Sequence, residues 1–218
     1  MNQEQQPEPP KPTWRGLLHK YAFWSSIPLF FLLLYLSNSK TIGVAIIYGL
    51  SLSGLLGTSA LYHRINWTPK WRWLMRRLDH TMIFVLIAGT FTPFAVLFLQ
   101  GGMKTFLLSA LWLSVVLGII MNLLWHNSPK WIRALTYVVV GWMGMIAFPD
   151  LLDKAGWVCM GLIAFGGVLY TIGALAYAAK RPNPIPTVFG YHEVFHSFVI
   201  LGALAHYVSI AGYVIPST

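Results

Sequence analysis

The chain has 218 residues, of which 56% are hydrophobic and only 10% are charged. Soluble domains carry about 25% charged residues, so this composition excludes an ordinary soluble protein and indicates an integral membrane protein. The formal net charge of +9 would suit nucleic acid, but the basic residues flank apolar runs instead of lining one polar face. We therefore expect them to contact anionic lipid headgroups, and we expect no nucleic acid partner.

The N-terminal residues differ from the rest of the chain. Residues 1–13 are polar and rich in proline, and we predict that they form a disordered tail. Residues 14–218 form the predicted transmembrane domain. The single cysteine, Cys159, lies inside an apolar run and is expected to be a small buried side chain, because one cysteine cannot form an intrachain disulfide.

The apolar runs predict the fold class, an all-α membrane protein that is a bundle of seven transmembrane helices. A helix needs about 20 apolar residues to cross the hydrocarbon core. Strands of a membrane β-barrel need only about 9–11 residues of alternating character, and these runs are longer and continuous. The predicted helices cover approximately residues 21–37, 42–62, 80–99, 105–125, 132–148, 156–179 and 192–214.

The distribution of lysine and arginine predicts the orientation of this bundle. With seven crossings, twelve of these residues fall on the side of the N-terminus and of the second, fourth and sixth links, and three fall on the other side. Basic residues concentrate on the cytoplasmic side of membrane proteins. The N-terminus is therefore predicted to be cytoplasmic and the C-terminus extracytoplasmic, in a multi-pass protein of the cell (inner) membrane.

The longest link, residues 64–78, interleaves Trp67, Trp71 and Trp73 with basic residues. This pattern is typical of an amphipathic segment that lies at the level of the lipid headgroups. A binding site for a regulatory protein partner is the alternative, and the sequence does not identify any such partner.

The last apolar run opens on two histidines, His192 and His196. Residues four apart on a helix point to the same face, one turn apart, so both imidazoles can bind one metal ion. Polar groups within a membrane segment are costly and usually functional. The alternative is a pair of core histidines that hydrogen-bond to neighbouring groups.

Successive helices cross the membrane in opposite directions. The end of the second helix and the starts of the third and seventh therefore lie on the same side, and further polar residues stand there. His63 ends the second predicted helix, Ser59 lies one turn before it, and Asp79 opens the third. Together with His192 and His196, His63 completes a three-histidine set, which in catalytic zinc sites leaves a fourth position open for water. Asp79 could act as the general base, and Ser59 could orient it or bind substrate. A carboxylate at a helix N-terminus is also explained by the helix dipole.

Other candidates fit this site less well. His80 points about 100° around the helix from Asp79, and His206 lies about 21 Å along the helix from His192. His19 and His126 lie near the predicted membrane borders and carry no specific signal. The pattern His-Glu-x-x-His also occurs in zinc proteases, where the Glu is the general base. That alternative would assign the role to Glu193, but position 202, where a third histidine of the metzincin pattern would stand, is glycine.

Taken together, the motifs resemble the bacterial haemolysin III family, within the superfamily of progestin and adipoQ receptors (PAQR). The residues that carry the resemblance are SALYH at 59–63, LDHT at 78–81, LIAGTFTPF at 86–94, GGVLYTIG at 166–173, KRP at 180–182 and HEVFH at 192–196. The resemblance covers roughly residues 45–214. Many bacterial members carry a Glu, an Asn and a His in and before the first helix, and residues 15–21 of this chain, which include His19, lack the Glu and the Asn.

This resemblance implies seven helices, a cytoplasmic N-terminus, and zinc bound by three histidines that correspond to His63, His192 and His196. It also maps Asp79 and Ser59 to an aspartate and a serine of the family site. Eukaryotic relatives look like hormone receptors with ceramidase-type amide hydrolysis, whereas the bacterial name refers to cell lysis. Three functions therefore stay open: a zinc-dependent lipid amide or ester hydrolase, a receptor or regulator of lipid homeostasis with structural zinc, and a cytolysin-like pore.

Overall fold

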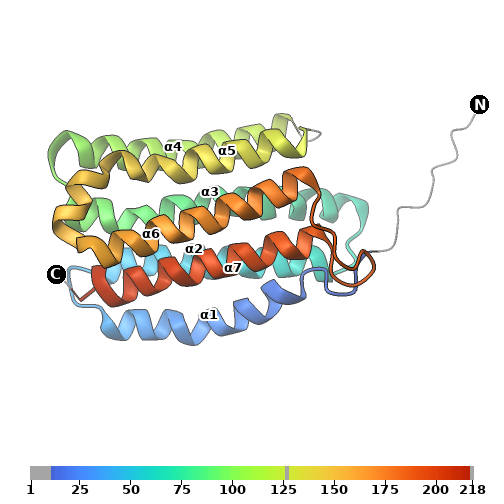
Figure 1. The fold of residues 1–218 in the computed structure, drawn as a ribbon, viewed down its shortest axis with the longest axis horizontal. Coiled ribbons are helices and arrows are strands. Elements are labelled where there is room, and N and C mark those ends of the chain that lie inside the picture. Colours follow the sequence, from blue (N-terminus) through green and yellow to red (C-terminus); the bar gives the residue numbers. More distant parts are fainter. Residues whose placement is uncertain (1–10, 126–127, 217–218) are drawn as a thin grey trace, which may run out of the picture.

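The described part of the chain, residues 11–125 and 128–216 of a computed structural model, is built from helices (Figure 1). The predicted disorder of residues 1–10 lies outside the described residues. Within those ranges no strand occurs, and the only β contact is an isolated bridge between Ile185 and Phe189. The elements are α1 (Leu17–Leu36), α2 (Ile42–Arg64), α3 (Pro69–Phe98), α4 (Gly101–Leu124), α5 (Lys130–Met143), the 3-10 turn η1 (Gly144–Ala147), α6 (Phe148–Ala179), α7 (Tyr191–Ser209) and the π-helical turn η2 (Ile210–Val214).

Among the described residues, six segments are long and apolar enough to cross a membrane, which confirms an all-helical, multi-pass membrane protein. One of the six, Lys130–Ala179, contains α5, η1 and α6, and within it the chain reverses direction so that α6 packs back along α5 (Figure 1). The described chain enters the bundle at one end and leaves it at the other. The count of seven crossings and the cytoplasmic position of the N-terminus remain predictions.

Sequential packing brings the ends of distant helices together. α7 packs mainly against α6, and α2 packs against both α1 and α3. α1, α3, α5 and α7 all begin at the same end of the bundle, on the right in Figure 1, where α2 and α6 end. This arrangement places the last turn of α2, the early turns of α3 and the first turns of α7 at one level.

The two helices that begin furthest ahead of the predicted apolar runs are α3 and α6. α3 starts at Pro69, a residue favoured in the first turn of a helix, so the tryptophan-rich residues 69–78 are its first turns and not a separate segment. α6 starts at Phe148 and passes through Gly156, whose φ of 79° kinks it. Residues 149–155, expected to be a link, are therefore helical.

The outer surface of the bundle is apolar, as contact with lipid requires. Large side chains such as Tyr35, Leu124 and Trp157 are 85%, 80% and 76% exposed. Inside, Cys159 is fully buried and free of disulfides, as predicted. Because hydrocarbon is as apolar as a side chain, burial does not drive these helices together, and polar groups placed inside the bundle need partners there.

Candidate metal centre

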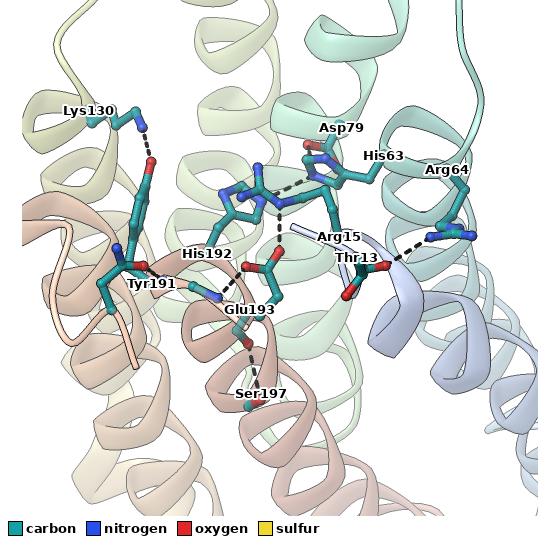
Figure 2. A network of polar contacts seen from close by, with 12 residues as sticks. Thr13, Arg15, His63, Arg64, Asp79, Lys130, Tyr191, His192, Glu193 and Ser197 are labelled. Atoms are coloured by element: carbon teal, nitrogen blue, oxygen red, sulfur yellow. Dashed lines mark hydrogen bonds and ion pairs between the residues drawn. The ribbon is translucent and has the colours of Figure 1, made fainter. Parts of the chain in front are cut away.

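Three histidines from two helices meet at the end of the bundle where α7 begins. His192 and His196 lie one turn apart near the start of α7, and His63 is the next-to-last residue of α2. One ring nitrogen from each lies within 4.8 Å of the other two. The Nε2 atoms of His63 and His192 are 3.2 Å apart (Figure 2). The structure thus brings together the set that crossing parity predicted.

The start of α7 is fixed by Glu193, which lies between the two histidines in the sequence. The Glu193 carboxylate accepts a hydrogen bond from the backbone N–H of Gly190, at 2.9 Å, which caps the helix. Its other oxygen forms an ion pair with Arg15, and the Glu193 side chain is 1% exposed (Figure 2). Both carboxylate oxygens of Glu193 thus have partners that secure the helix start, which favours Asp79 over Glu193 as the carboxylate available to a ligand.

A short segment ahead of α1 covers this end of the site. The backbone N–H groups of Thr13 and Trp14 bond to the carbonyls of Thr187 and Val188 in the loop before α7. Gly16 follows with φ 76°, and an added Cβ there would lie 2.5 Å from the Cβ of His63. Glycine is therefore required at this position both by the backbone conformation and by the close approach to His63.

Asp79 and Ser59 lie beside the three histidines, as predicted. Asp79 Oδ2 is 3.9 Å from His63 Nε2, and the Asp79 side chain is only 13% exposed. Ser59 lies one turn before His63 on α2 and lines the same cavity as Asp79. The Asp79 carboxylate thus lies within reach of a group bound next to His63.

The donor set fits zinc. A tetrahedral zinc ion with bonds of about 2.0–2.1 Å separates its nitrogen ligands by about 3.3 Å, close to the 3.2 Å between the two Nε2 atoms. Three neutral imidazoles leave the fourth position open, which is the pattern of catalytic zinc sites. Without an ion, the two Nε2 atoms share a single hydrogen bond, and one of them must be protonated.

The histidines that we set aside as ligands are outside this group. His80 Nδ1 lies 3.2 Å from a terminal nitrogen of Arg133, and His206 Nε2 lies 3.0 Å from the carbonyl oxygen of Ile163. Neither belongs to the His63, His192 and His196 group within the described residues. His126 is outside the described residues.

His19 is the site residue that the sequence did not identify. It lies on α1, is 2% exposed, and its ring stacks on that of His196 with centroids 3.8 Å apart and planes 4° apart. The apolar pattern predicts a first helix that begins near residue 21, which places His19 at the membrane border. In the structure α1 begins at Leu17, and His19 is part of the helix. Arg15, the partner of Glu193, stands four residues before His19. Arg15 and His19 thus both contact α7, and their proximity in the sequence is the signal that could have identified this segment.

A mainly apolar cavity runs from this site into the bundle. It reaches from Asp79 and His192 past Tyr177 and Phe195 to His206, between α3, α5, α6 and α7. It is also lined by Arg133, which contacts His80, and by Tyr137, both on α5. Arg133 is 5% exposed and its Nε has no partner in the described chain, nor does the hydroxyl of Tyr137. The cavity thus combines an apolar channel with donors at the metal end.

Comparisons with known proteins agree with this picture. The family model described as "Haemolysin-III related" matches residues 8–207. The chain is 31% identical to Hemolysin-3 of Bacillus cereus over 206 residues, which is 93% of this chain and 91% of that protein. It is 30% identical to the Hemolysin-3 homolog of Bacillus subtilis, covering 91% and 92% of the two chains.

More distant similarity extends to animal proteins. The monocyte to macrophage differentiation factor of Homo sapiens is 25% identical over 174 residues, or 77% of this chain and 68% of that one. The adiponectin receptor protein of Drosophila melanogaster is 28% identical over 72% of this chain and 39% of its own length. With a family model that spans nearly all of the helical domain, this chain belongs to the haemolysin III family, within the superfamily of progestin and adipoQ receptors.

Proposed function

We propose that the chain is a zinc-dependent hydrolase that cleaves an amide or ester bond of a membrane lipid. One observation carries the proposal: the three nitrogens of His63, His192 and His196, with Asp79 beside them, stand at the end of an apolar cavity within the bundle. A structural zinc site needs neither an open fourth position nor an adjacent carboxylate. A substrate with an acyl chain would fill the apolar part and present its polar bond to the histidines.

The residues have separate roles in this reaction. A zinc ion on the three histidines would supply a Lewis acid and generate hydroxide from water near neutral pH. Asp79 receives the proton of the attacking water and later delivers it to the leaving amine or alcohol. Ser59 lines the cavity with Asp79, and its hydroxyl would orient the Asp79 carboxylate. The arrangement requires the carboxylate to be within one water molecule of His63, as the 3.9 Å contact allows.

The remainder of the site suits the polar end of a lipid. Arg133 and Tyr137 offer unpartnered donors near the histidines, and a buried guanidinium without a carboxylate partner favours a ligand that carries oxygen acceptors. The basic residues at this end of the bundle would bind anionic headgroups and orient the protein in the cell membrane with the site toward the cytoplasm.

The proposal is tested by comparing wild type with Asp79→Asn in membranes of an expression host. Zinc per chain is measured on the purified proteins, and membrane lipids are profiled by mass spectrometry. We expect both proteins to carry zinc and only the wild type to release fatty acid, with a loss of about 10²–10⁴-fold in rate for the variant. Equal lipid profiles for the two proteins, with zinc present in both, would reject the hydrolase.

The second candidate is a receptor or regulator with structural zinc. The histidines join the end of α2 to the start of α7, and the Arg15–Glu193 pair ties the segment before α1 to the same helix. Metal binding would then set the relative position of three helices. A cytolysin-like pore, suggested by the names of the bacterial relatives, is supported least, because the cavity lining lacks the charged rings that conducting pores use.

A further inference from the structure

His19 is a buried polar residue that the proposed reaction has not used. Both ring nitrogens, Nδ1 and Nε2, are inaccessible to solvent and have no hydrogen-bond partner among the described residues. A buried polar group without a partner costs about 1–3 kcal/mol, and such a group in a folded protein usually has a ligand or a catalytic task. His19 also lines the cavity that ends at the metal centre.

The stacking geometry excludes His19 as a fourth ligand of the same ion. An imidazole binds zinc through a nitrogen lone pair, which lies in the plane of the ring, at about 2.0–2.1 Å. The rings of His19 and His196 are parallel within 4° and their centroids are 3.8 Å apart. An ion in the plane of His196 is therefore too far from the plane of His19 to be bound by both rings.

His19 and Asp79 approach the centre from different helices. α2, which carries His63, packs against α1 on one side and α3 on the other. His19 reaches the group from α1 and contacts His196, whereas Asp79 reaches it from α3 and contacts His63. In the proposed reaction the Asp79 carboxylate takes the proton of the attacking water. His19 is the second polar group, and it remains available to contact the substrate.

Hydrolysis of an amide requires such a group. When water adds to the carbonyl carbon, the π electrons move to the carbonyl oxygen, which becomes negatively charged, and Asp79 takes the water proton. When the carbonyl re-forms, the carbon–nitrogen bond breaks and the proton held by Asp79 passes to the amine. Hydrogen-bond donors that face the charged oxygen typically contribute 10²–10³-fold to the rate, and a neutral imidazole can be such a donor.

We propose that His19 donates a hydrogen bond from a ring N–H to the carbonyl oxygen of the bound lipid while that oxygen carries negative charge. This inference rests on the proposed hydrolase function and adds a catalytic residue to it. His19 keeps its proton throughout the step. The stack on His196 holds the imidazole in place, because it restricts rotation of a ring that no hydrogen bond restrains.

Two substitutions separate this role from a structural one. His19→Phe keeps an aromatic ring that can stack on His196 but has no N–H, whereas His19→Gln keeps an N–H donor without the ring. Zinc-loaded proteins in detergent are titrated with an N-dodecanoyl amide and with its phosphonamidate analogue, whose tetrahedral oxygens imitate the charged intermediate. The measured quantities are the two dissociation constants and the zinc content.

We expect wild type to bind the phosphonamidate more tightly than the amide. His19→Phe should weaken phosphonamidate binding by about 10²-fold, change amide binding by less than threefold and keep one zinc per chain, and His19→Gln should recover part of the loss. Unchanged phosphonamidate binding in His19→Phe would overturn the inference and leave His19 as a packing residue. Loss of zinc in that variant would overturn it in favour of a metal ligand. If wild type itself shows no preference for the phosphonamidate, the hydrolase proposal fails first.

Discussion

His206 and His19 are two buried histidines that line the same cavity, and they differ in whether the protein supplies a hydrogen-bond partner. His206 is 6% exposed, its Nε2 lies 3.0 Å from the carbonyl oxygen of Ile163, and its ring meets that of Tyr170 edge-on. His19 is 2% exposed, and neither of its nitrogens has a partner in the described chain. The bundle can therefore satisfy a buried imidazole with its own backbone. At His19 it does not, and a ligand in the cavity can supply the missing partner.

The same contrast holds between the two ends of the bundle. At the end away from the histidines, Lys104 and Lys154 donate hydrogen bonds to the carbonyl oxygens of Val96 and Phe98, in the last turn of α3. Those cations complete a helix terminus. At the histidine end, Arg133 retains an unpartnered Nε inside the cavity. The two lysines at the far end are therefore structural, whereas the Arg133 Nε at the histidine end is available to a ligand.

The largest effect is expected from His63. His63→Ala should lower zinc affinity by more than about 10²-fold, since even residues that only support the ligands contribute 10–100-fold. The matched control is His80→Ala, because His80 lies at the same level but contacts Arg133. Zinc is measured by mass spectrometry on both purified variants. Full zinc in His63→Ala with loss in His80→Ala would mean that the third ligand is His80.

Gly16→Ala tests how closely the segment before α1 is fitted to the centre. We expect a loss of about 2–4 kcal/mol in unfolding free energy, from the positive φ and from the clash with the Cβ of His63. Weaker zinc binding should accompany it, because His63 has to move. Gly43→Ala is the control, since no atom lies within 4 Å of an added Cβ there. Equal thermal stability of Gly16→Ala and wild type in detergent would show that this fit is loose.

The sequence predicts the helical segments and the three-histidine group because apolar length, Lys and Arg placement and the spacing of His192 and His196 are local signals. It does not reveal His19 or Arg133 as cavity residues. Their position depends on helix starts and on packing between α1 and α7 or between α5 and α3, which no periodicity encodes. The role of Glu193 was also hidden, because its partner Arg15 is 178 residues away.

We expect unequal changes in stability from substitutions of His206, which has a hydrogen-bond partner, and of His19, which has none among the described residues. His206→Leu should cost about 1–2 kcal/mol, since it removes the buried hydrogen bond between the imidazole and the Ile163 carbonyl oxygen. His19→Phe should change stability by less than about 0.5 kcal/mol or raise it, because it removes two unpartnered atoms. Thermal unfolding in nanodiscs measures both, and zinc content should be unchanged in each. If His19→Phe lost more stability than His206→Leu, the contrast between an unpartnered and a partnered histidine would be wrong.

The smallest effect is expected at the far end of the bundle. Lys104→Met keeps the length of the side chain but removes the ammonium that bonds to Val96 O at 3.0 Å. The bond satisfies a carbonyl that has no intrahelical partner, so its loss should cost about 0.5–1 kcal/mol. Lys40→Met, at the same end of the bundle, is the control, because no described group accepts a hydrogen bond from the Lys40 side chain. Zinc binding and substrate binding should equal those of wild type in both variants, since neither lysine lines the cavity that ends at the histidines. A change in zinc affinity for Lys104→Met would mean that the two ends are coupled through α3, and the division into a structural end and a ligand-binding end would then be wrong.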